Sequence, residues 1–328
     1  MVREEFYKDV LDHVSDGVYF ITPDRRITYW NAGAQRITGY SPEEVIGHGC
    51  WEGILRHVNA AGRQLCLQGC PLQAVMKDGK TREAQLYLHH KDGHRVAVSV
   101  RGQALRDSDG EIVGSMEVFS ACEASSYSGI HRDRKDDSRD AVTGLSSRRF
   151  GELHLDTLMR AVADGTTSLG MLYADADHFK DINDTYGHRT GDAVLRMVGQ
   201  SLVTGLRRED VPVRWGGEEF VALLPGIDEA GLTKVAERVR MLVENSWIQR
   251  GDKQIRATVS VGATMAVPGE SPDDLTDRAD QLMYASKRAG RNRVTSGTRV
   301  AGSGPGSTPI GVITPISISP SARIPQTI

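Results

Sequence analysis

Hydrophobic and polar positions alternate in the first third of the chain in a way that predicts short strands and helices. GVYFIT and RITYWN have strand composition and are joined by Pro-Asp-Arg, and three longer strands are predicted at AQLYLHH, HRVAVSV and EIVGSMEVFS. Short helices are predicted at EEFYKDVLDHV, at SPEEVIG, where Ser41, Pro42 and Glu44 fit a capping box, and at LQAVMKDG. This pattern predicts a compact α+β module over residues 1–121.

The second half of the chain has a different pattern, with longer helices between strands. From Leu145 to Val294 the order is helix, strand, helix, helix, hairpin, helix, strand, helix. The apolar strand LGMLYAD ends in Asp175, and Asp177 shares its face if the strand continues. Asp177 is explained equally well as a cap of a helix beginning near His178. Asp175 is harder to explain structurally, because a half-buried carboxylate without a partner is costly.

The stretch VPVRWGGEEFVALLP predicts a hairpin with two charged residues at its turn. Gly216 and Gly217 favour a two-residue turn, since such turns need positive φ. Alone, Glu218 and Glu219 are best explained as a solvated tip. The alternative is a bare backbone that a ligand can approach, with a carboxylate that holds a metal. If the hairpin pairs beside LGMLYAD, Glu218 reaches Asp175, and the pair suits Mg²⁺ completed by substrate phosphate.

Composition narrows the class of protein. The 328 residues are enough for two domains, and a net charge of −3 gives no electrostatic case for a nucleic-acid partner. No apolar run approaches the ~18 residues of a membrane helix, and the N-terminus lacks an apolar signal segment. A cytoplasmic protein with no membrane partner is therefore expected. Residues 122–142 are a charged linker or signalling helix, and the Pro-, Gly- and Ser-rich residues 296–328 are expected to be disordered.

The first module resembles a PAS domain, a sensory fold with an antiparallel sheet and short helices. The resemblance is carried by VSDGVYFITPDRRITYWNAGAQRITGYSPEEVIG and KDGHRVAVSVRGQALRDSDGEIVGSMEVF. It says little about a ligand, because PAS domains bind many small molecules or none. A PAS domain that serves only for dimerisation is an open alternative.

The second module resembles the GGDEF family of diguanylate cyclases. DADHFKDINDTYGHRTGD, RWGGEEF, TVSVGAT and DRADQLMYASKRAGRNRV occur in that family's order and spacing, and the opening DAVTGLSSRRF departs from it only at Ala141-Val142. The resemblance implies a cyclase-like palm over residues 143–295, with a central, mostly antiparallel sheet flanked by helices. It implies condensation of two GTP into cyclic di-GMP and two pyrophosphates by a homodimer. The alternative is a silent receptor that only binds nucleotide.

The resemblance also assigns site residues. It makes Asp175, the Ala176 carbonyl and Glu218 the ligands of Mg²⁺ or Mn²⁺, with Glu218 also the base. Lys180 would neutralise phosphate charge. The remaining substrate-binding positions are Asn183, His188, Asp192, Gly216, Gly217, Glu219, Lys287 and Arg291. Of these, Asn183 and Asp192 would recognise guanine, which favours GTP over ATP, and Lys287 and Arg291 would hold the terminal phosphates.

Two further groups of residues invite a function. Arg207 and Asp210 form an Arg-x-x-Asp pattern, which alone is usually a surface ion pair. Asp210 lies six residues before Gly216, and this offset resembles that of the product-inhibition site of the GGDEF family. The resemblance implies Arg238 as a second contact with the product.

The other group is Cys50, Cys66 and Cys70 in the first module. Free cysteines are usually small buried core residues. The alternative is a metal site, an iron–sulfur cluster or a redox switch.

Overall fold

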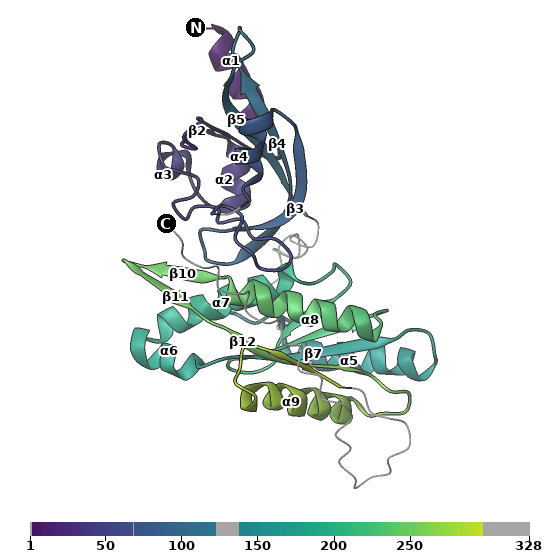
Figure 1. The fold of residues 1–328 in the computed structure, drawn as a ribbon. Helices are drawn as coiled ribbons and strands as arrows, with labels where there is room; N and C mark the ends of the chain where they lie inside the picture. The colour runs from purple at the N-terminus through teal and green to yellow at the C-terminus, as the bar shows by residue number, and fades with distance from the viewer. Residues whose placement is uncertain (1, 68, 123–137, 298–328) are drawn as a thin grey trace, which may run out of the picture.

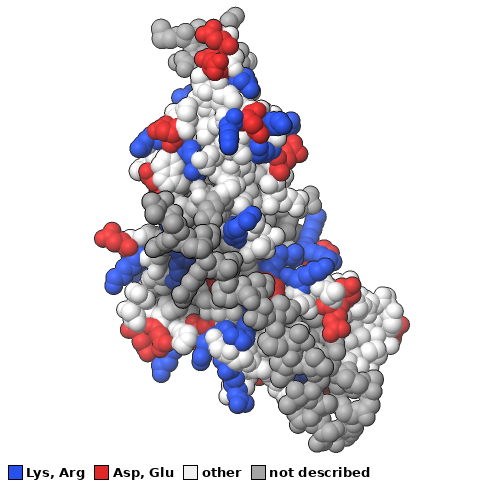
Figure 2. Space-filling model, viewed as in Figure 1, with Lys and Arg blue, Asp and Glu red and all other residues white. Residues whose placement is uncertain are grey.

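The computed structural model describes residues 2–67, 69–122 and 138–297 (Figure 1). Most of the predicted linker and nearly all of the predicted C-terminal tail lie outside the described residues. The described chain forms an N-terminal and a C-terminal domain that lie against each other. No helix in the described ranges is long and apolar enough to cross a membrane. Figure 2 shows basic and acidic side chains interspersed on the face in view.

The N-terminal domain contains a five-stranded antiparallel sheet in the order β2-β1-β5-β4-β3. Its strands are β1 (Gly17–Ile21), β2 (Ile27–Trp30), β3 (Arg82–His89), β4 (Arg95–Arg106) and β5 (Ile112–Ala121). The two short and three longer strands are those predicted from the alternation of apolar and polar positions.

Short helices surround this sheet, as predicted. They are α1 (Val2–Asp12), α2 (Ala32–Thr38), α3 (Pro42–Val45) and α4 (Pro71–Asp78). The capping box of α3 is present, with the Ser41 backbone N–H donating to the Glu44 carboxylate. Helix α2 was not predicted; its N-cap is Asn31, whose side chain accepts from the Ala34 N–H. Asn31 is a favourable cap, but only seven residues separate it from Gly39.

The C-terminal domain has a six-stranded sheet in the order β13-β12-β7-β9-β8-β6. Its strands are β6 (Ser146–Ser147), β7 (Leu169–Ala176), β8 (Val211–Arg214), β9 (Glu219–Pro225), β12 (Val259–Met265) and β13 (Val294–Ser296). Only the short edge strands β6 and β13 pair in parallel, so the sheet is mostly antiparallel, as expected. The central strand β7 is buried along its whole length.

Helices cover both faces of the sheet. The helices are α5 (Arg148–Ala163), α6 (Phe179–Tyr186), α7 (His188–Thr204), α8 (Glu229–Glu244) and α9 (Pro272–Arg288). The two hydrophobic clusters lie on opposite faces, one under α7 and α8 and the other under α5 and α9. Figure 1 places α7, α8 and the separate hairpin of β10 (Trp247–Arg250) and β11 (Lys253–Arg256) on the side facing the N-terminal domain.

Candidate functional site

Asp175 lies near the end of the central strand, where it meets a lysine from another element. Its side chain is buried, and its Oδ2 is 2.7 Å from Nζ of Lys287 on α9. Across the strand pair, Asp175 is the register partner of Glu219, and the Ala176 N–H donates to the Glu218 carbonyl. The hairpin therefore pairs beside β7, as the sequence analysis proposed, and brings both glutamates to Asp175.

The turn between β8 and β9 differs from the prediction. It contains four residues, Trp215–Glu218, instead of two, and neither Gly216 nor Gly217 has positive φ. The turn closes with the N–H groups of Trp215 and Gly216 both donating to the Glu219 carbonyl. The prediction of a two-residue turn was wrong because the strand pairing stops at Arg214.

Of the two glycines in this turn, Gly217 faces open space and Gly216 makes room for the Glu219 side chain. A Cβ at Gly217 would meet no atom within 4 Å, whereas one at Gly216 would lie 2.3 Å from Oε2 of Glu219. Arg214 stabilises the turn, because its guanidinium donates to the carbonyls of Gly216 and Gly217. The same guanidinium pairs with Asp140 at 2.9 Å. Sequence reasoning missed this support, because Asp140 lies in the part of the chain assigned to the linker.

The site has an excess of carboxylates over cations. Burial raises the pKa of Asp175 to about 6, although the Lys287 ammonium opposes the shift. Burial also raises the pKa of Glu218 and of Asp280 on α9, and the Glu219 charge adds to both shifts. Neighbouring carboxylates destabilise one another's charged forms, so a further cation would stabilise this group.

The donor chemistry fits a hard divalent cation. Oxygen ligands are available from Asp175, Glu218 and the Ala176 carbonyl. Mg²⁺ prefers oxygen ligands and commonly completes its coordination shell with substrate phosphate. Within the described ranges, no set of three or more His, Cys, Asp or Glu side chains is arranged to hold a metal ion.

The carboxylate of Asp177 is held by hydrogen bonds from neighbouring loops and strands. Its carboxylate accepts from the hydroxyls of Thr258 and Ser260, both at 2.7 Å, and from the Asn292 N–H at 3.1 Å. The interpretation of Asp177 as a helix cap was wrong, because His178 precedes α6 and has no side-chain capping bond. Asp177 joins β7 to the loops around β12 and α9.

The α6–α7 junction holds the residues expected to recognise a base. Asn183 is half-buried on α6, and a Cβ on Gly191 would lie 1.9 Å from its Oδ1. Gly191 is therefore required for the Asn183 amide to lie against α7, next to the half-buried Asp192. Gly187, with φ of 80°, makes the corner between the helices. His188 is exposed at this corner, and Lys180 is exposed at the opposite, N-terminal end of α6.

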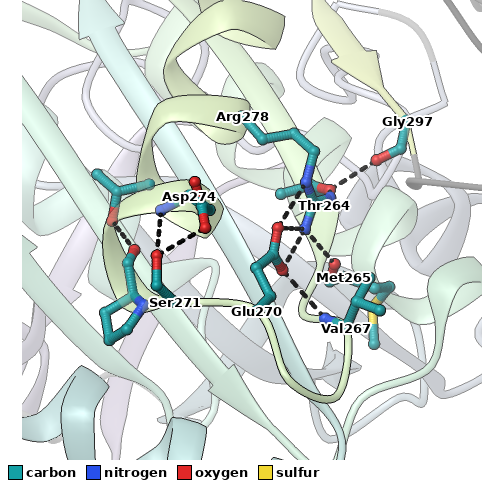
Figure 3. A network of polar contacts seen from close by, with 10 residues as sticks. Thr264, Met265, Val267, Glu270, Ser271, Asp274, Arg278 and Gly297 are labelled. Carbon is teal, nitrogen blue, oxygen red and sulfur yellow. Dashed lines mark hydrogen bonds and ion pairs between the residues drawn. The ribbon is translucent and has the colours of Figure 1, made fainter. Parts of the chain in front are cut away.

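Helix α9 is anchored so that Lys287 lies at the site. Near its N-terminal end, Arg278 pairs with Glu270 at 2.7 Å and contacts Thr264 and the Met265 carbonyl of β12 (Figure 3). The side chain of Glu270 is nearly fully buried, so this ion pair fixes the helix on the sheet. Arg291 follows α9 with φ of 62° and is exposed.

Arg207 and Asp210 form a tight turn away from the carboxylates. Asp210 is buried and its Oδ2 accepts from the Arg207 N–H at 2.7 Å, while the Arg207 side chain is 54% exposed and can reach a ligand. Burial raises the pKa of Asp210. Arg238 points at the start of the same loop, since its Nε and Nη2 donate to the Gly205 carbonyl at 2.9 and 2.6 Å.

The three cysteines are core residues of the N-terminal domain. Cys50, Cys66 and Cys70 are buried and unpaired, which matches their interpretation as small core residues. Burial raises the pKa of Cys50 to about 11 and of Cys66 to about 12, so both thiols stay protonated near neutrality. Metal ligation needs thiolates, and the described residues contain no set of side chains placed for it. A metal or iron–sulfur site thus finds no support in this arrangement.

Comparison with family models assigns both domains. Residues 137–293 match the model described as diguanylate cyclase, GGDEF domain, and residues 11–121 match the model described as PAS fold. The chain carries a PAS domain followed by a GGDEF domain. Both resemblances found in the sequence are thereby confirmed.

Curated relatives agree over the GGDEF domain. The response regulator PleD of Caulobacter vibrioides is 40% identical over 158 residues, which are 47% of this chain and 35% of PleD. Diguanylate cyclase A of Treponema denticola is 40% identical over 143 residues, 43% of this chain and 38% of that protein. The chain thus spans little more than a third of the length of these two relatives.

A solved structure is also similar to the GGDEF part of this chain. The GGDEF domain of DgcB from Caulobacter crescentus, in complex with c-di-GMP, is 36% identical. The matched region covers 51% of this chain and 97% of the DgcB chain, with a TM-score of 0.48.

Proposed function

We propose that the GGDEF domain condenses two GTP molecules into cyclic di-GMP with release of two pyrophosphates. The observation that carries this proposal is the meeting of Asp175, Glu218 and the Lys287 ammonium beside the open backbone of Gly217. Carboxylates for a divalent cation, a cation for phosphate and a backbone free of side chains are the parts that phosphoryl transfer needs. A 40%-identical relative named diguanylate cyclase A supports the reaction class.

In the proposed reaction, a ribose 3′-hydroxyl oxygen attacks the α-phosphorus of the facing GTP. The new bond is O3′–P, the bond from the α-phosphorus to the bridging oxygen breaks, and pyrophosphate leaves. Glu218 takes the hydroxyl proton, a role that its raised pKa favours. Asp175, Glu218 and the Ala176 carbonyl would hold Mg²⁺ or Mn²⁺, which supplies neutralisation of phosphate charge.

Phosphate binding falls to the basic side chains around the turn. Lys287 neutralises the triphosphate together with Arg291, and Lys180 approaches from α6. When GTP binds, the Lys287 ammonium would exchange its contact with Asp175 for phosphate oxygens. That exchange frees the Asp175 carboxylate for the cation and keeps charge balanced.

Guanine selectivity is assigned to Asn183 and Asp192. A carboxylate accepts from N1–H and the 2-amino group of guanine, and an amide donates to O6 or N7. Adenine leaves such buried groups unpaired, which is the basis for strong discrimination. The close packing of Asn183 on Gly191 supports this assignment, because it fixes the amide against the residue that precedes Asp192.

Each product contains two phosphodiester bonds, so we propose a homodimer in which each subunit presents one GTP. We also propose product inhibition through Arg207, Asp210 and Arg238. An exposed guanidinium over a buried carboxylate turn can bind phosphate and a guanine edge together. Arg238 donates to the Gly205 carbonyl, so its guanidinium lies at the start of this loop.

The decisive experiment is direct. Purified protein is incubated with GTP and Mg²⁺, and nucleotides are separated by chromatography. Appearance of cyclic di-GMP supports the cyclase, and tight GTP binding without turnover would instead favour a silent nucleotide receptor. ATP in place of GTP tests the base selectivity.

An absorption spectrum of anaerobically purified protein tests the cysteines. Reversible oxidation that changes turnover would support the redox role of Cys50, Cys66 and Cys70. A featureless visible spectrum, with turnover unchanged by oxidant, would leave them as core residues.

A further inference from the structure

The PAS and GGDEF domains meet at one buried tryptophan. Trp247 begins the β10–β11 hairpin of the GGDEF domain and is only 3% exposed. The His89 ring from the end of β3 stacks on it, with ring centroids 3.6 Å apart and an interplanar angle of 12°. The Trp247 N–H donates to the Gly93 carbonyl at 3.1 Å, and a His89 ring nitrogen lies 3.2 Å from the Trp247 carbonyl. The β3–β4 turn of the PAS domain thus holds the backbone and the ring of Trp247.

Arg95, just after this turn, extends the contact. Its side chain is fully buried, and Nε and Nη2 donate to the Asn245 carbonyl at 2.9 and 2.7 Å. In return, the Thr204 hydroxyl at the end of α7 donates to the Arg95 carbonyl at 2.8 Å. These bonds reach the C-terminal ends of α7 and α8, which lie side by side in the layer that separates the PAS domain from the sheet (Figure 1).

This contact is specific, yet it carries energetic costs that allow it to open. The guanidinium groups of Arg56, Arg95 and Arg256 lie 4.8, 5.3 and 5.0 Å from the Trp247 ring centroid. No carboxylate within the described ranges pairs with any of these three arginines, and burial lowers the pKa of Arg95 to about 9. Each guanidinium–indole contact is favourable, but the three like charges repel one another without a counter-charge, which offsets part of that stabilisation.

Two buried histidines add to this cost. Nδ1 of His89 and Nδ1 of His94 are buried without a hydrogen-bond partner among the described residues. A buried polar atom without a hydrogen-bond partner destabilises the state in which it is buried. We call the contact of His89, Gly93 and Arg95 with Trp247 and Asn245 the Trp247 seam. It combines close geometric fit with opposing energetic costs, as expected of a contact that forms and opens reversibly.

We propose that the Trp247 seam is a releasable lock by which the PAS domain restrains its own GGDEF domain. In the docked state the GGDEF domain has one fixed orientation relative to the PAS domain, whereas condensation requires two GTP-loaded domains to face each other. When the seam opens, the GGDEF domain can reorient and face the GGDEF domain of a second subunit. The activity readout of this proposal rests on the proposed cyclase function, and its structural readout does not.

The lock also reaches the loop assigned to product inhibition. Thr204, bonded to Arg95, directly precedes Gly205, whose carbonyl accepts from Arg238. Arg207 follows two residues later. Docking therefore adds a bond from the PAS domain to the start of a loop that α8 already holds through Arg238.

A single methyl group at Gly93 provides the test. A Cβ there would lie 2.3 Å from the Trp247 carbonyl oxygen and 2.8 Å from the Ile248 side chain, so Gly93→Ala must push the domains apart. Gly110→Ala is the matched control: it lies in the next PAS turn, between β4 and β5, with φ of 84° against 100° at Gly93. A Cβ at Gly110 would meet nothing within 4 Å, so the two variants share backbone strain and differ in the clash.

Two measurements on the full chain decide the outcome. In Gly93→Ala, amide hydrogen exchange of residues 247–256 should accelerate at least tenfold and the initial rate of cyclic di-GMP synthesis should rise at least threefold. Gly110→Ala should behave as wild type in both. Unchanged exchange in Gly93→Ala would refute the docked seam, and faster exchange with an unchanged or lower rate would refute the restraint.

Thr204→Val provides a second route that does not strain the PAS turn. It removes the hydroxyl donor to the Arg95 carbonyl with little change in shape, and it should give the same changes at smaller amplitude. If the protein makes no cyclic di-GMP in any form, the cyclase assignment fails while the exchange data still test the docking.

Discussion

The ammonium of Lys287 lies 2.7 Å from the carboxylate of Asp175, so a helix end and the central strand share one charge pair at the candidate site. The pair joins residues 112 positions apart in the chain. It is surrounded by carboxylates, and the single ammonium leaves the pKa of Asp175 raised to about 6. A site in this condition favours any ligand that brings further positive charge.

Loss of either carboxylate should abolish catalysis while the fold persists. We expect Asp175→Ala and Glu218→Ala each to lower cyclic di-GMP synthesis at least a thousandfold, because cation and triphosphate charge would be uncompensated. Thermal stability should not fall, since each change removes a destabilised carboxylate. Chromatographic assay beside calorimetry checks both statements, and near wild-type turnover in either variant would reject the assignment.

Asp177→Ala provides the contrast two residues away. It removes the acceptor of two hydroxyls and one backbone N–H, leaving buried donors unsatisfied. We expect a loss of roughly 2–4 kcal/mol in the free energy of unfolding of the GGDEF domain. Denaturant unfolding measures it; an unchanged midpoint would mean that Asp177 is not structural.

Base recognition is tested by one methyl group on α7. Gly191→Ala places a Cβ where Oδ1 of Asn183 lies, so the amide must turn away from Asp192. We expect KM for GTP to rise at least tenfold and the preference for GTP over ATP to shrink. Gly199→Ala is the control on the same helix, where a Cβ would be 3.3 Å from a flexible Leu145 methyl. Both variants gain helix propensity equally, so similar KM values for the two would contradict the role of Asn183.

Sequence reasoning located the fold and the site where local pattern and spacing carry the information. The period-two strands, the capping box of α3 and the hairpin beside β7 were all predictable. The turn at Gly216 was not, because its four-residue form depends on where β8 and β9 stop pairing. Neither were the supports that join distant segments, such as Arg214 with Asp140, because they follow from tertiary packing.

The same limit applies to the seam between the domains. Trp247 is followed by a polar stretch, and nothing in its neighbourhood distinguishes a core tryptophan from one that binds a second domain. The burial of Arg95 was equally unpredictable, since a lone arginine in a strand is usually exposed.

Product inhibition should depend on Arg207. We expect Arg207→Ala to raise the inhibition constant for cyclic di-GMP at least tenfold with initial turnover unchanged, since the residue lies away from the carboxylates. The neighbouring exposed Arg208→Ala changes net charge equally and should leave inhibition as in wild type. Rate measurements at increasing added cyclic di-GMP give the curves; coincident curves for Arg207→Ala and wild type would refute the site.

The stability of the PAS domain should fall between pH 6.5 and 8 because of one buried acid. Glu117 on β5 lies beside Tyr19, and its Oε1 is 3.5 Å from Nε2 of His57. Burial raises the pKa of Glu117 to about 8, opposed by a hydrogen bond from Tyr19. Burial, with Arg95 nearby, lowers the pKa of His57 to about 4, so His57 stays neutral throughout this pH range.

The sign follows from proton counting. Between pH 6.5 and 8 the folded state keeps the Glu117 proton that the unfolded chain has lost, so the stabilisation present at low pH disappears as pH rises through the folded pKa. The slope approaches ~1.4 kcal/mol per pH unit for one proton. Glu117→Gln should flatten it, whereas Glu111→Gln, an exposed change on the same domain, should not. Calorimetric unfolding of both variants and wild type at pH 6.5, 7.25 and 8 measures the slope, and equal slopes for Glu117→Gln and wild type would assign it to another group.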